Sequence, residues 1–317
     1  MTQALASNLT LVESPVLHLL ERVDYFRRAI FGQASAARRS ALGQYPTPAK
    51  VAVHMASMFT GQNAQIRLLD AGAGVGSLTA AFVAEMCARD VKPREIQTTL
   101  FELDATFCEH LHATVDLCRQ HCQRSGILFT GKILCEDFIA SGVGLLQSSL
   151  FQQERFDCAI LNPPYKKINS NSEARRLLSA VGIETSNLYT AFLSLALHLL
   201  ENEGQLVAIT PRSFCNGPYF KPFRQLLMGM MEIRQIHIYE SRTQTFRDDE
   251  ILQENIIFHA VKTRTNIDTV VITTDHGPDE LATEQTISAH DLVHPHDPDC
   301  FIHIVSGEQG LKASAAM

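Results

Sequence analysis

The sequence predicts an α/β fold built on a mainly parallel, doubly wound sheet with an antiparallel hairpin at one edge. From residue 65 onward, short apolar runs alternate with segments of helical periodicity, which is typical of parallel sheets covered by helices. The last two strong apolar runs follow each other without a clear helix between them, which predicts the hairpin. Hydrophobic residues make up 45% of the 317 residues, enough to bury a sizeable core.

The elements follow in order along the chain. Apolar side chains recur every three to four residues near the start, which predicts a helical segment within 1–39. The turn-rich segment 44–48 (QYPTP) comes next. Helices are then expected at 49–59, 77–88, 105–124, 187–202 and 219–231. Strands are expected at 66–70, 98–104, within 127–138, and at 156–162, 205–210, 234–240, 255–262 and 268–274. We therefore divide the chain into 1–39, a main domain over 40–274 and a short, loop-rich appendage over 275–317.

Charge and composition exclude several classes of protein. The longest apolar run, 188–200, is shorter than the roughly 18 residues needed to cross a bilayer. Because the first residues also lack a signal-peptide pattern, we expect a cytoplasmic protein without membrane contact. The net charge of −7 argues against a protein that coats nucleic acid, although it leaves room for a local basic cleft.

Cysteine usage predicts neither disulfides nor a metal. The eight Cys include no CxxC pair, and an intracellular chain of this size needs no disulfide, so free thiols are expected. Cys and His residues crowd the predicted helix over 108–122. One helix cannot direct four ligands at one point, so we predict no metal site there.

A glycine-rich turn follows the first predicted strand and precedes a helix. Its pattern, D-x-G-x-G-x-G, comprises Asp70, Gly72, Gly74 and Gly76. Glycines let the backbone approach a ligand, and a helix N-terminus presents unpaired N–H groups. The pattern departs from the dinucleotide fingerprint G-x-G-x-x-G, and it suits a cofactor with an amino-acid tail and no pyrophosphate. Simple strand-to-helix packing is the alternative.

Two further strand ends carry carboxylates. Glu102 lies near the end of the next predicted strand, where an acid can accept both hydroxyls of a ribose. Asp137 and Phe138 end the third strand-like run; the carboxylate can accept the exocyclic amine of adenine, and the ring can stack on the purine. The alternatives are a surface carboxylate at 102, and a helix-capping Asp with a core Phe at 137–138.

The most specific motif is Asn162-Pro163-Pro164-Tyr165, directly after an apolar strand. Two prolines stiffen the turn and remove backbone N–H groups, so the carbonyls remain as acceptors. The side-chain oxygen of Asn162 and the carbonyl of Pro163 can together accept two hydrogen bonds from one amino group. Tyr165 offers a flat face to a planar base or amide. The motif therefore predicts a site that orients an NH2 nitrogen for attack on a methyl group.

Together these motifs resemble the gamma-class adenine-N6 DNA methyltransferases of the restriction–modification methylase superfamily. In that class a segment similar to 44–48 precedes the glycine turn and NPPY follows it, as here. The segment 246–255 (FRDDEILQEN) is also similar to the family's region around motif VIII. The resemblance covers roughly 40–262. It implies a catalytic domain with a Rossmann-like, seven-stranded, S-adenosylmethionine-dependent methyltransferase sheet whose antiparallel hairpin lies at the edge.

The resemblance also assigns roles to residues. The cofactor S-adenosylmethionine would be bound by Tyr45, Thr47, Pro48, Asp70, Gly72, Gly74, Gly76, Glu102, Asp137 and Phe138. A flipped adenine of DNA would be held by Asn162, Pro163, Pro164 and Tyr165, with Phe246 as a second wall. The basic residues that follow, Lys166, Lys167, Arg175 and Arg176, either contact phosphates or form a solvated basic face.

The resemblance leaves partners and rival functions to consider. Family members that act alone usually carry a long C-terminal target-recognition domain, whereas about fifty residues follow the last core strand here. We therefore expect dependence on a specificity subunit or on a missing C-terminal portion. One rival is an NPPY methyltransferase acting on a protein glutamine or on RNA, although such enzymes usually carry a separate N-terminal helical domain. Another is a non-catalytic DNA-binding or assembly subunit, against which the intact NPPY and glycine motifs argue.

Overall fold

The computed structural model describes residues 15–33, 46–148, 154–239, 255–263, 265, 267–275 and 282–304. Two predicted site residues, Tyr45 and Phe246, lie outside the described residues. Their assignments to the cofactor and to the target base therefore stay predictions, as do the domain boundaries.

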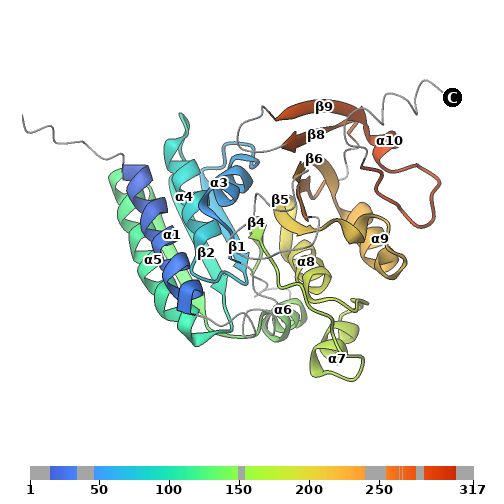
Figure 1. Cartoon of the computed structure of the whole chain (residues 1–317), viewed down its shortest axis with the longest axis horizontal. Coiled ribbons are helices and arrows are strands. Elements are labelled where there is room, and N and C mark those ends of the chain that lie inside the picture. Colours follow the sequence, from blue (N-terminus) through green and yellow to red (C-terminus); the bar gives the residue numbers. More distant parts are fainter. Residues whose placement is uncertain are drawn as a thin grey trace, which may run out of the picture.

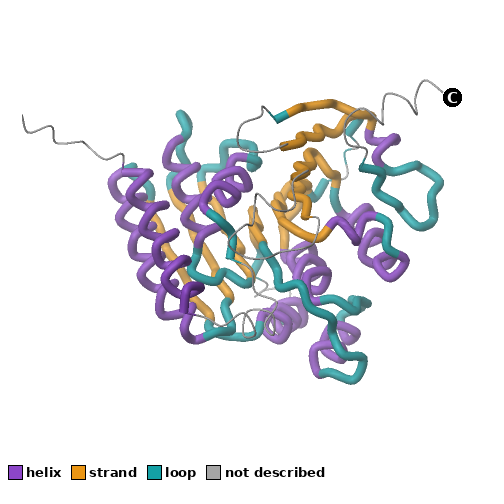
Figure 2. The backbone as a smooth tube through the Cα atoms, viewed as in Figure 1, coloured by secondary structure: helices purple, strands orange, loops and turns teal. Residues whose placement is uncertain are grey.

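A mixed sheet forms the middle layer of the molecule (Figures 1 and 2). Within the described residues its order is β3-β2-β1-β4-β5-β7-β6-β8-β9. The strands are β1 (Gln65–Ala71), β2 (Glu95–Phe101), β3 (Leu128–Leu134), β4 (Phe156–Leu161), β5 (Leu200–Pro211), β6 (Glu232–Tyr239), β7 (Asn255–Val261), β8 (Thr269–Asp275) and β9 (Thr283–Ser288). Strands β1 to β5 pair in parallel, β7 runs antiparallel to both neighbours, and β9 runs antiparallel to β8.

The α/β class with a largely parallel sheet is confirmed, but the expected number of seven strands is wrong, because nine are present in the described residues. The predicted antiparallel pair, β6 and β7, forms; however, it does not lie at the edge. Strand β8 pairs in parallel with β6, and β9 adds the outer strand. Strand β9 was not predicted from the sequence. Its residues, TEQTIS, are mostly exposed and polar, and they lack the apolar alternation of a half-buried strand.

Helices cover both faces of the sheet and make three layers (Figure 1). One face carries α1 (Pro15–Gln33), α3 (Ala49–Ser57), α4 (Ser77–Ala88) and α5 (Ala105–Arg124). The other carries α6 (Phe138–Gln147), α7 (Glu173–Ala180), α8 (Leu188–Leu199) and α9 (Lys221–Met230). The short turns η1 (Arg212–Cys215) and η2 (Pro218–Phe220) precede α9, and α10 (Ala289–Leu292) follows β9. No helix of the described ranges has both the length and the apolarity to cross a membrane.

Two apolar cores lie on opposite faces of the sheet because successive side chains of a strand point in opposite directions. In β5, Leu206 and Ala208 belong to the core beneath α6, α8 and α9. Val207 and Ile209 belong to the core beneath α1, α3, α4 and α5. β5 is thus buried on both sides. The carboxyl ends of the parallel strands β1 to β5 lie at one edge of the sheet.

A buried arginine anchors the C-terminal described segment to the loop after β5. Arg224 of α9 is fully buried and donates to the carbonyls of Phe214, Gly217 and Asp299. Its guanidinium lies 4.7 Å from the ring centre of Phe301. These bonds tie residues 299–301 to η1, although the sequence offers no sign that this arginine is buried.

Candidate active site

A cavity of about 270 Å³ opens at the carboxyl ends of β1, β2, β3 and β4. In open α/β sheets this edge is where ligands bind. The cavity brings together segments that are distant in the sequence, namely 46–47, 72–78, 101–107, 136–139 and 162–166. It therefore unites most of the predicted site motifs in one place.

The three motif glycines adopt positive φ angles, yet they serve different purposes. Gly72 (φ +77°) and Gly74 (φ +58°) line the cavity, and a Cβ placed on Gly74 would meet no atom within 4 Å. A Cβ on Gly76 (φ +85°) would lie 2.8 Å from side-chain carbons of both Leu111 and Thr114. Gly76 therefore permits the close approach of α4 and α5, whereas Gly72 and Gly74 shape the cavity wall.

Asp70 links the end of β1 to the first turn of α4, on the two sides of the glycine turn. Its side chain is fully buried, and Oδ2 accepts a hydrogen bond of 2.7 Å from the hydroxyl of Thr79. Oδ1 is buried without a partner in the described structure. Burial raises the pKa of Asp70 to about 7. The cavity lining does not include Asp70, so direct contact with a cofactor stays a prediction.

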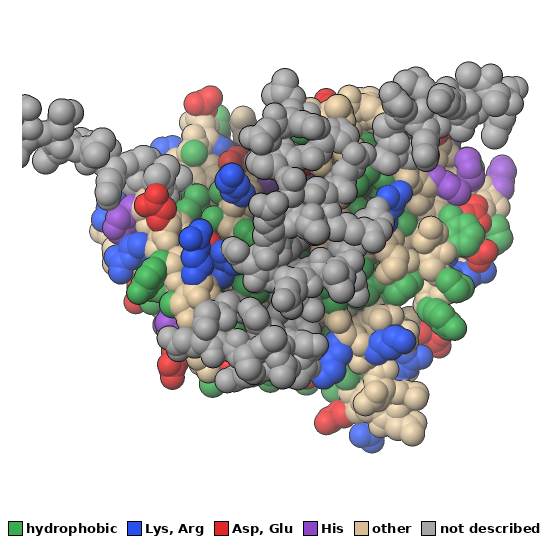
Figure 3. Space-filling model, viewed as in Figure 1, with side chains coloured by type: hydrophobic (Ala, Val, Ile, Leu, Met, Phe, Trp, Pro, Cys, Tyr) green, Lys and Arg blue, Asp and Glu red, His purple; other side chains and the backbone are tan. Residues whose placement is uncertain are grey.

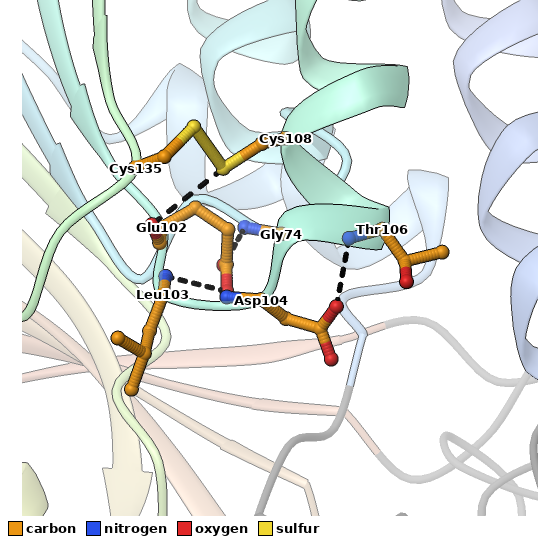
Figure 4. The surroundings of a disulfide bond; sticks show 7 residues. All are labelled: Gly74, Glu102, Leu103, Asp104, Thr106, Cys108 and Cys135. Carbon is orange, nitrogen blue, oxygen red and sulfur yellow. Dashed lines mark hydrogen bonds between the residues drawn. A yellow bond between two sulfur atoms is a disulfide. The ribbon is translucent and has the colours of Figure 1, made fainter.

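Glu102 lines the cavity and holds the glycine turn at the same time (Figure 4). Oε2 accepts from the N–H of Gly74 at 2.8 Å, and Oε1 accepts from the N–H groups of Leu103 and Asp104 at 2.9 and 2.8 Å. Burial raises the pKa of Glu102, and these backbone donors oppose that rise. An oxygen that accepts one N–H can accept a further donor, so Oε2 is the atom suited to a ribose hydroxyl.

A disulfide between Cys108 and Cys135 lies directly beside Glu102 (Figure 4). The expectation of free thiols is therefore wrong for these two cysteines. Their Cα atoms are 6.3 Å apart, which is within reach of a disulfide, because α5 begins beside the end of β3. The sequence spacing of 27 residues between Cys108 and Cys135 could not predict this bond, because one residue lies on a helix and the other on a loop. The bond links the first turn of α5 to the loop before Glu136, which also lines the cavity.

Asp137 and Phe138 begin a helix instead of ending a strand. β3 stops at Leu134, and Asp137 caps α6 by accepting from the N–H of Ile139 at 2.7 Å. Phe138 is 2% exposed, with its ring 5.0 and 5.1 Å from those of Phe101 and Phe192. Both residues nevertheless line the cavity. Asp137 therefore is a helix cap and Phe138 is a core residue, as the alternatives predicted. Because both also line the cavity, either can still contact the adenine of a cofactor.

Asn162 is oriented from both sides. Its Nδ2 donates to the hydroxyl of Thr47 at 3.0 Å, across 115 residues of sequence. Its Oδ1 accepts from the phenol of Tyr165 at 3.1 Å, and that phenol also lies 3.3 Å from the carbonyl of Ile209. The segment 46–47 therefore meets the NPPY turn at the cavity wall, where Asn162 and Pro164 are exposed to the cavity.

In the rest of the NPPY turn, the two prolines offer backbone carbonyls as acceptors, and Tyr165 packs against a neighbouring ring. The N–H of Lys166 donates to the carbonyl of Pro164 at 3.2 Å, and no donor among the described residues reaches the carbonyl of Pro163. The Tyr165 ring lies edge-on to Tyr189, with centres 6.1 Å apart. Pro48, Pro163 and Tyr165 are not part of the cavity lining. The contact of the Pro163 carbonyl with an amino group and the stacking of Tyr165 on a base therefore stay predictions.

Sequence reasoning missed several residues of the cavity wall. Phe192 and Leu188 of α8 line it, as do Phe107 and Ala174. The run 188–200 is mostly apolar, so its pattern indicates a core helix and does not distinguish the residues that face a ligand.

The fold is that of the class I, S-adenosylmethionine-dependent methyltransferases. A solved structure titled a putative class I S-adenosylmethionine-dependent methyltransferase, from Listeria monocytogenes, superposes with a TM-score of 0.57. It is 12% identical, and the match covers 83% of this chain and 72% of that chain.

Sequence comparison identifies the family. The family model described as Eco57I restriction-modification methylase matches residues 95–246. The Type II methyltransferase M.PstI of Providencia stuartii is 39% identical over 288 residues, and M.BsuBI of Bacillus subtilis is 38% identical over 291. Each match covers 90% of this chain and 56% of the relative, so the chain spans about half the length of these curated relatives. The chain belongs to the restriction–modification methylase family, as its motifs predict.

Proposed function

We propose that this chain transfers a methyl group from S-adenosylmethionine to the N6 amino group of an adenine extruded from DNA, as the modification activity of a restriction–modification system. The observation that carries the proposal is the NPPY turn at the cavity wall. Two acceptors, the Oδ1 of Asn162 at the cavity wall and the carbonyl of the neighbouring Pro163, can together hold the two hydrogens of one amino group. Family membership supports DNA as the substrate.

The residues of the cavity fit S-adenosylmethionine. Open space at Gly74 leaves room for a ligand against the backbone, and Glu102 Oε2 has capacity for a ribose hydroxyl. The exposed Asp137 uses Oδ1 for its helix cap, which leaves Oδ2 for the adenine amine of the cofactor. When bound, S-adenosylmethionine supplies an electrophilic methyl group on a sulfonium.

The chain contributes positioning more than acid–base chemistry. A stacked base cannot present its N6 in line with the methyl group, so the target must leave the duplex. Asn162 and Pro163 then orient the amino nitrogen, and Thr47 and Tyr165 prevent the Asn162 amide from turning away. No strong general base is needed, because the nitrogen proton becomes acidic once the methyl group is transferred.

Product identification tests the proposal. The chain is incubated with labelled S-adenosylmethionine and separate pools of duplex DNA, RNA and protein, and each product is digested to its methylated unit. We expect N6-methyladenine from DNA. N-methylglutamine from protein, or methylated RNA alone, would replace this proposal with one of the rival substrates.

Substitutions at the NPPY turn test the roles of its residues. Asn162→Ala should reduce methyl transfer at least about a hundredfold and leave S-adenosylmethionine binding intact, because the lost acceptor orients the nucleophile and not the donor. Tyr165→Phe keeps the ring and loses the phenol that contacts Asn162 Oδ1 and the carbonyl of Ile209, so we expect about a fivefold loss of kcat. Tyr165→Ala should be more harmful. Equal effects of Phe and Ala at 165 would assign the whole role to the phenol and reject stacking.

We propose further that this chain depends on a partner subunit, or on additional chain, to read a DNA sequence. Specific readout usually takes about 1,000 Å² or more of protein surface, and the described structure consists mainly of the catalytic sheet and its helices. Sequencing the methylated products should therefore reveal no defined site. Methylation of one short duplex motif by the isolated chain would refute this dependence.

A further inference from the structure

The segment 166–187, which we call the arm, joins the NPPY turn to α8 and carries the protruding helix α7 (Figure 1). Two backbone bonds close its base: Leu188 N–H donates to Lys166 O at 2.8 Å, and Ile168 N–H donates to Ser186 O at 2.7 Å. Lys166 and Leu188 both line the cavity. The arm therefore starts and ends at the cavity wall, so its position relative to the target base is set by the backbone.

The arm is cationic in an acidic chain. It contains four Lys or Arg residues against two Glu, whereas the whole chain has a net charge of −7. Lys167 and Arg176 are exposed, and Arg175 is half-buried. No carboxylate among the described residues forms an ion pair with these three side chains. Figure 3 shows Lys and Arg side chains gathered where Figure 1 places α7.

The arm is also held in place by the core. Ile168, Leu178 and Ile183 are buried in the core beneath α6 and α8. Ser172 caps α7 by accepting from the N–H of Arg175 at 3.3 Å, and Ala174 of the same turn lines the cavity. The cationic residues at 175 and 176 thus follow a residue of the cavity wall on an anchored helix. A mobile surface loop would not fix charges at this place.

We propose that the arm is a phosphate clamp for the DNA strand that carries the extruded base, with Lys167, Arg175 and Arg176 contacting phosphates beside the target nucleotide. Extrusion moves a nucleotide out of the duplex while its flanking phosphates stay attached, so cations at the mouth of the base site lie where those phosphates must pass. Phosphate contacts position the nucleic acid without reading its sequence. The inference rests on the proposed function, because it takes the cavity to be the site of base methylation.

The test is the salt dependence of DNA binding. The variant Lys167→Glu/Arg176→Glu is compared with Lys92→Glu/Arg124→Glu, which makes the same change in net charge at exposed residues near the amino ends of β2 and β3. Binding of a duplex oligonucleotide is measured at several salt concentrations. The slope of log K against log salt should become shallower by about 0.9 for each phosphate that the variant no longer neutralises. We expect the arm variant to bind about tenfold or more weakly, with an unchanged affinity for S-adenosylmethionine.

The outcomes separate the arm from the proposed chemistry. Equal slopes and affinities for the arm variant and the control variant would overturn the clamp, even where the wild-type chain methylates adenine. A wild-type chain that binds duplex DNA with an arm-dependent slope but yields no N6-methyladenine would support the clamp and reject the proposed function. Tighter, arm-dependent binding to RNA of the same length would assign the arm to a different nucleic acid and overturn the DNA clamp.

Discussion

Replacing Gly74 and Gly76 by alanine should give different main defects, one in cofactor binding and one in stability, although the two residues stand two positions apart in one motif. A Cβ at Gly76 would lie 2.8 Å from carbons of Leu111 and Thr114, closer than real Cβ contacts. Relief requires α5 to shift, and Thr114 donates to the carbonyl of Val75 at 2.7 Å, so the shift also strains a buried hydrogen bond. A Cβ at Gly74 meets nothing within 4 Å.

The magnitudes follow from these contacts. A non-glycine residue at positive φ costs about 1–2 kcal/mol at either position. Overpacking adds about 1–3 kcal/mol at Gly76. We therefore expect Gly76→Ala to lower the free energy of unfolding by about 2–5 kcal/mol, and Gly74→Ala by about 1–2 kcal/mol. Gly74→Ala should instead weaken S-adenosylmethionine binding by about tenfold or more, because its methyl group stands at the cavity wall.

Urea unfolding and titration calorimetry measure the two quantities on the same preparations. The folded fraction of Gly76→Ala should bind the cofactor with nearly wild-type affinity, because Gly76 does not line the cavity. A Gly76→Ala protein as stable as the wild type would refute the packing argument. Wild-type cofactor affinity in Gly74→Ala would show that the ligand does not approach this part of the turn.

Two further predictions concern the buried acids of the site. Glu102→Ala removes the acceptor of three backbone N–H groups and of the expected ribose hydroxyl, so it should weaken S-adenosylmethionine binding by about 1–3 kcal/mol. Calorimetry that finds unchanged affinity in the folded variant would reject the ribose assignment. Burial raises the pKa of Asp70 to about 7 in the folded protein, above the ordinary aspartate value of about 3.8, so the unfolded chain ionises first as the pH rises. Its protonated form stabilises the fold below about pH 4, and this contribution is lost as the pH approaches 7. Asp70→Asn should therefore gain stability relative to the wild type between pH 4 and 7; a constant difference across that range would contradict the raised pKa.

Much of the framework is predictable from the sequence because it depends on neighbours along the chain. The helices α4 and α5 have the predicted bounds, since each follows a predicted strand in the alternation of strands and helices along the chain. The NPPY turn and the glycine turn follow the strands that the sequence predicts. In parallel sheets, turns after successive strands meet at one edge, so the motifs are also expected to converge.

What the sequence could not reveal depends on contacts between distant residues. The sequence predicts that Glu102 binds a ribose, but only the packed structure shows that it also holds the glycine turn through Gly74. The sequence predicts a strand end at 137–138, yet α6 begins there because β3 stops three residues before Asp137.

The sequence by itself determined the class of fold, the order of the motifs and the kind of atoms that the site offers. Only the tertiary structure decided which of those atoms already form hydrogen bonds or a disulfide within the protein. The amide of Asn162 is oriented by Thr47, which lies 115 residues away, and the Cys108–Cys135 bond joins a helix to a loop. The physical reason is that periodicity and turn chemistry act over a few residues, whereas hydrogen bonds and steric contacts across layers exist only once the sheet has assembled.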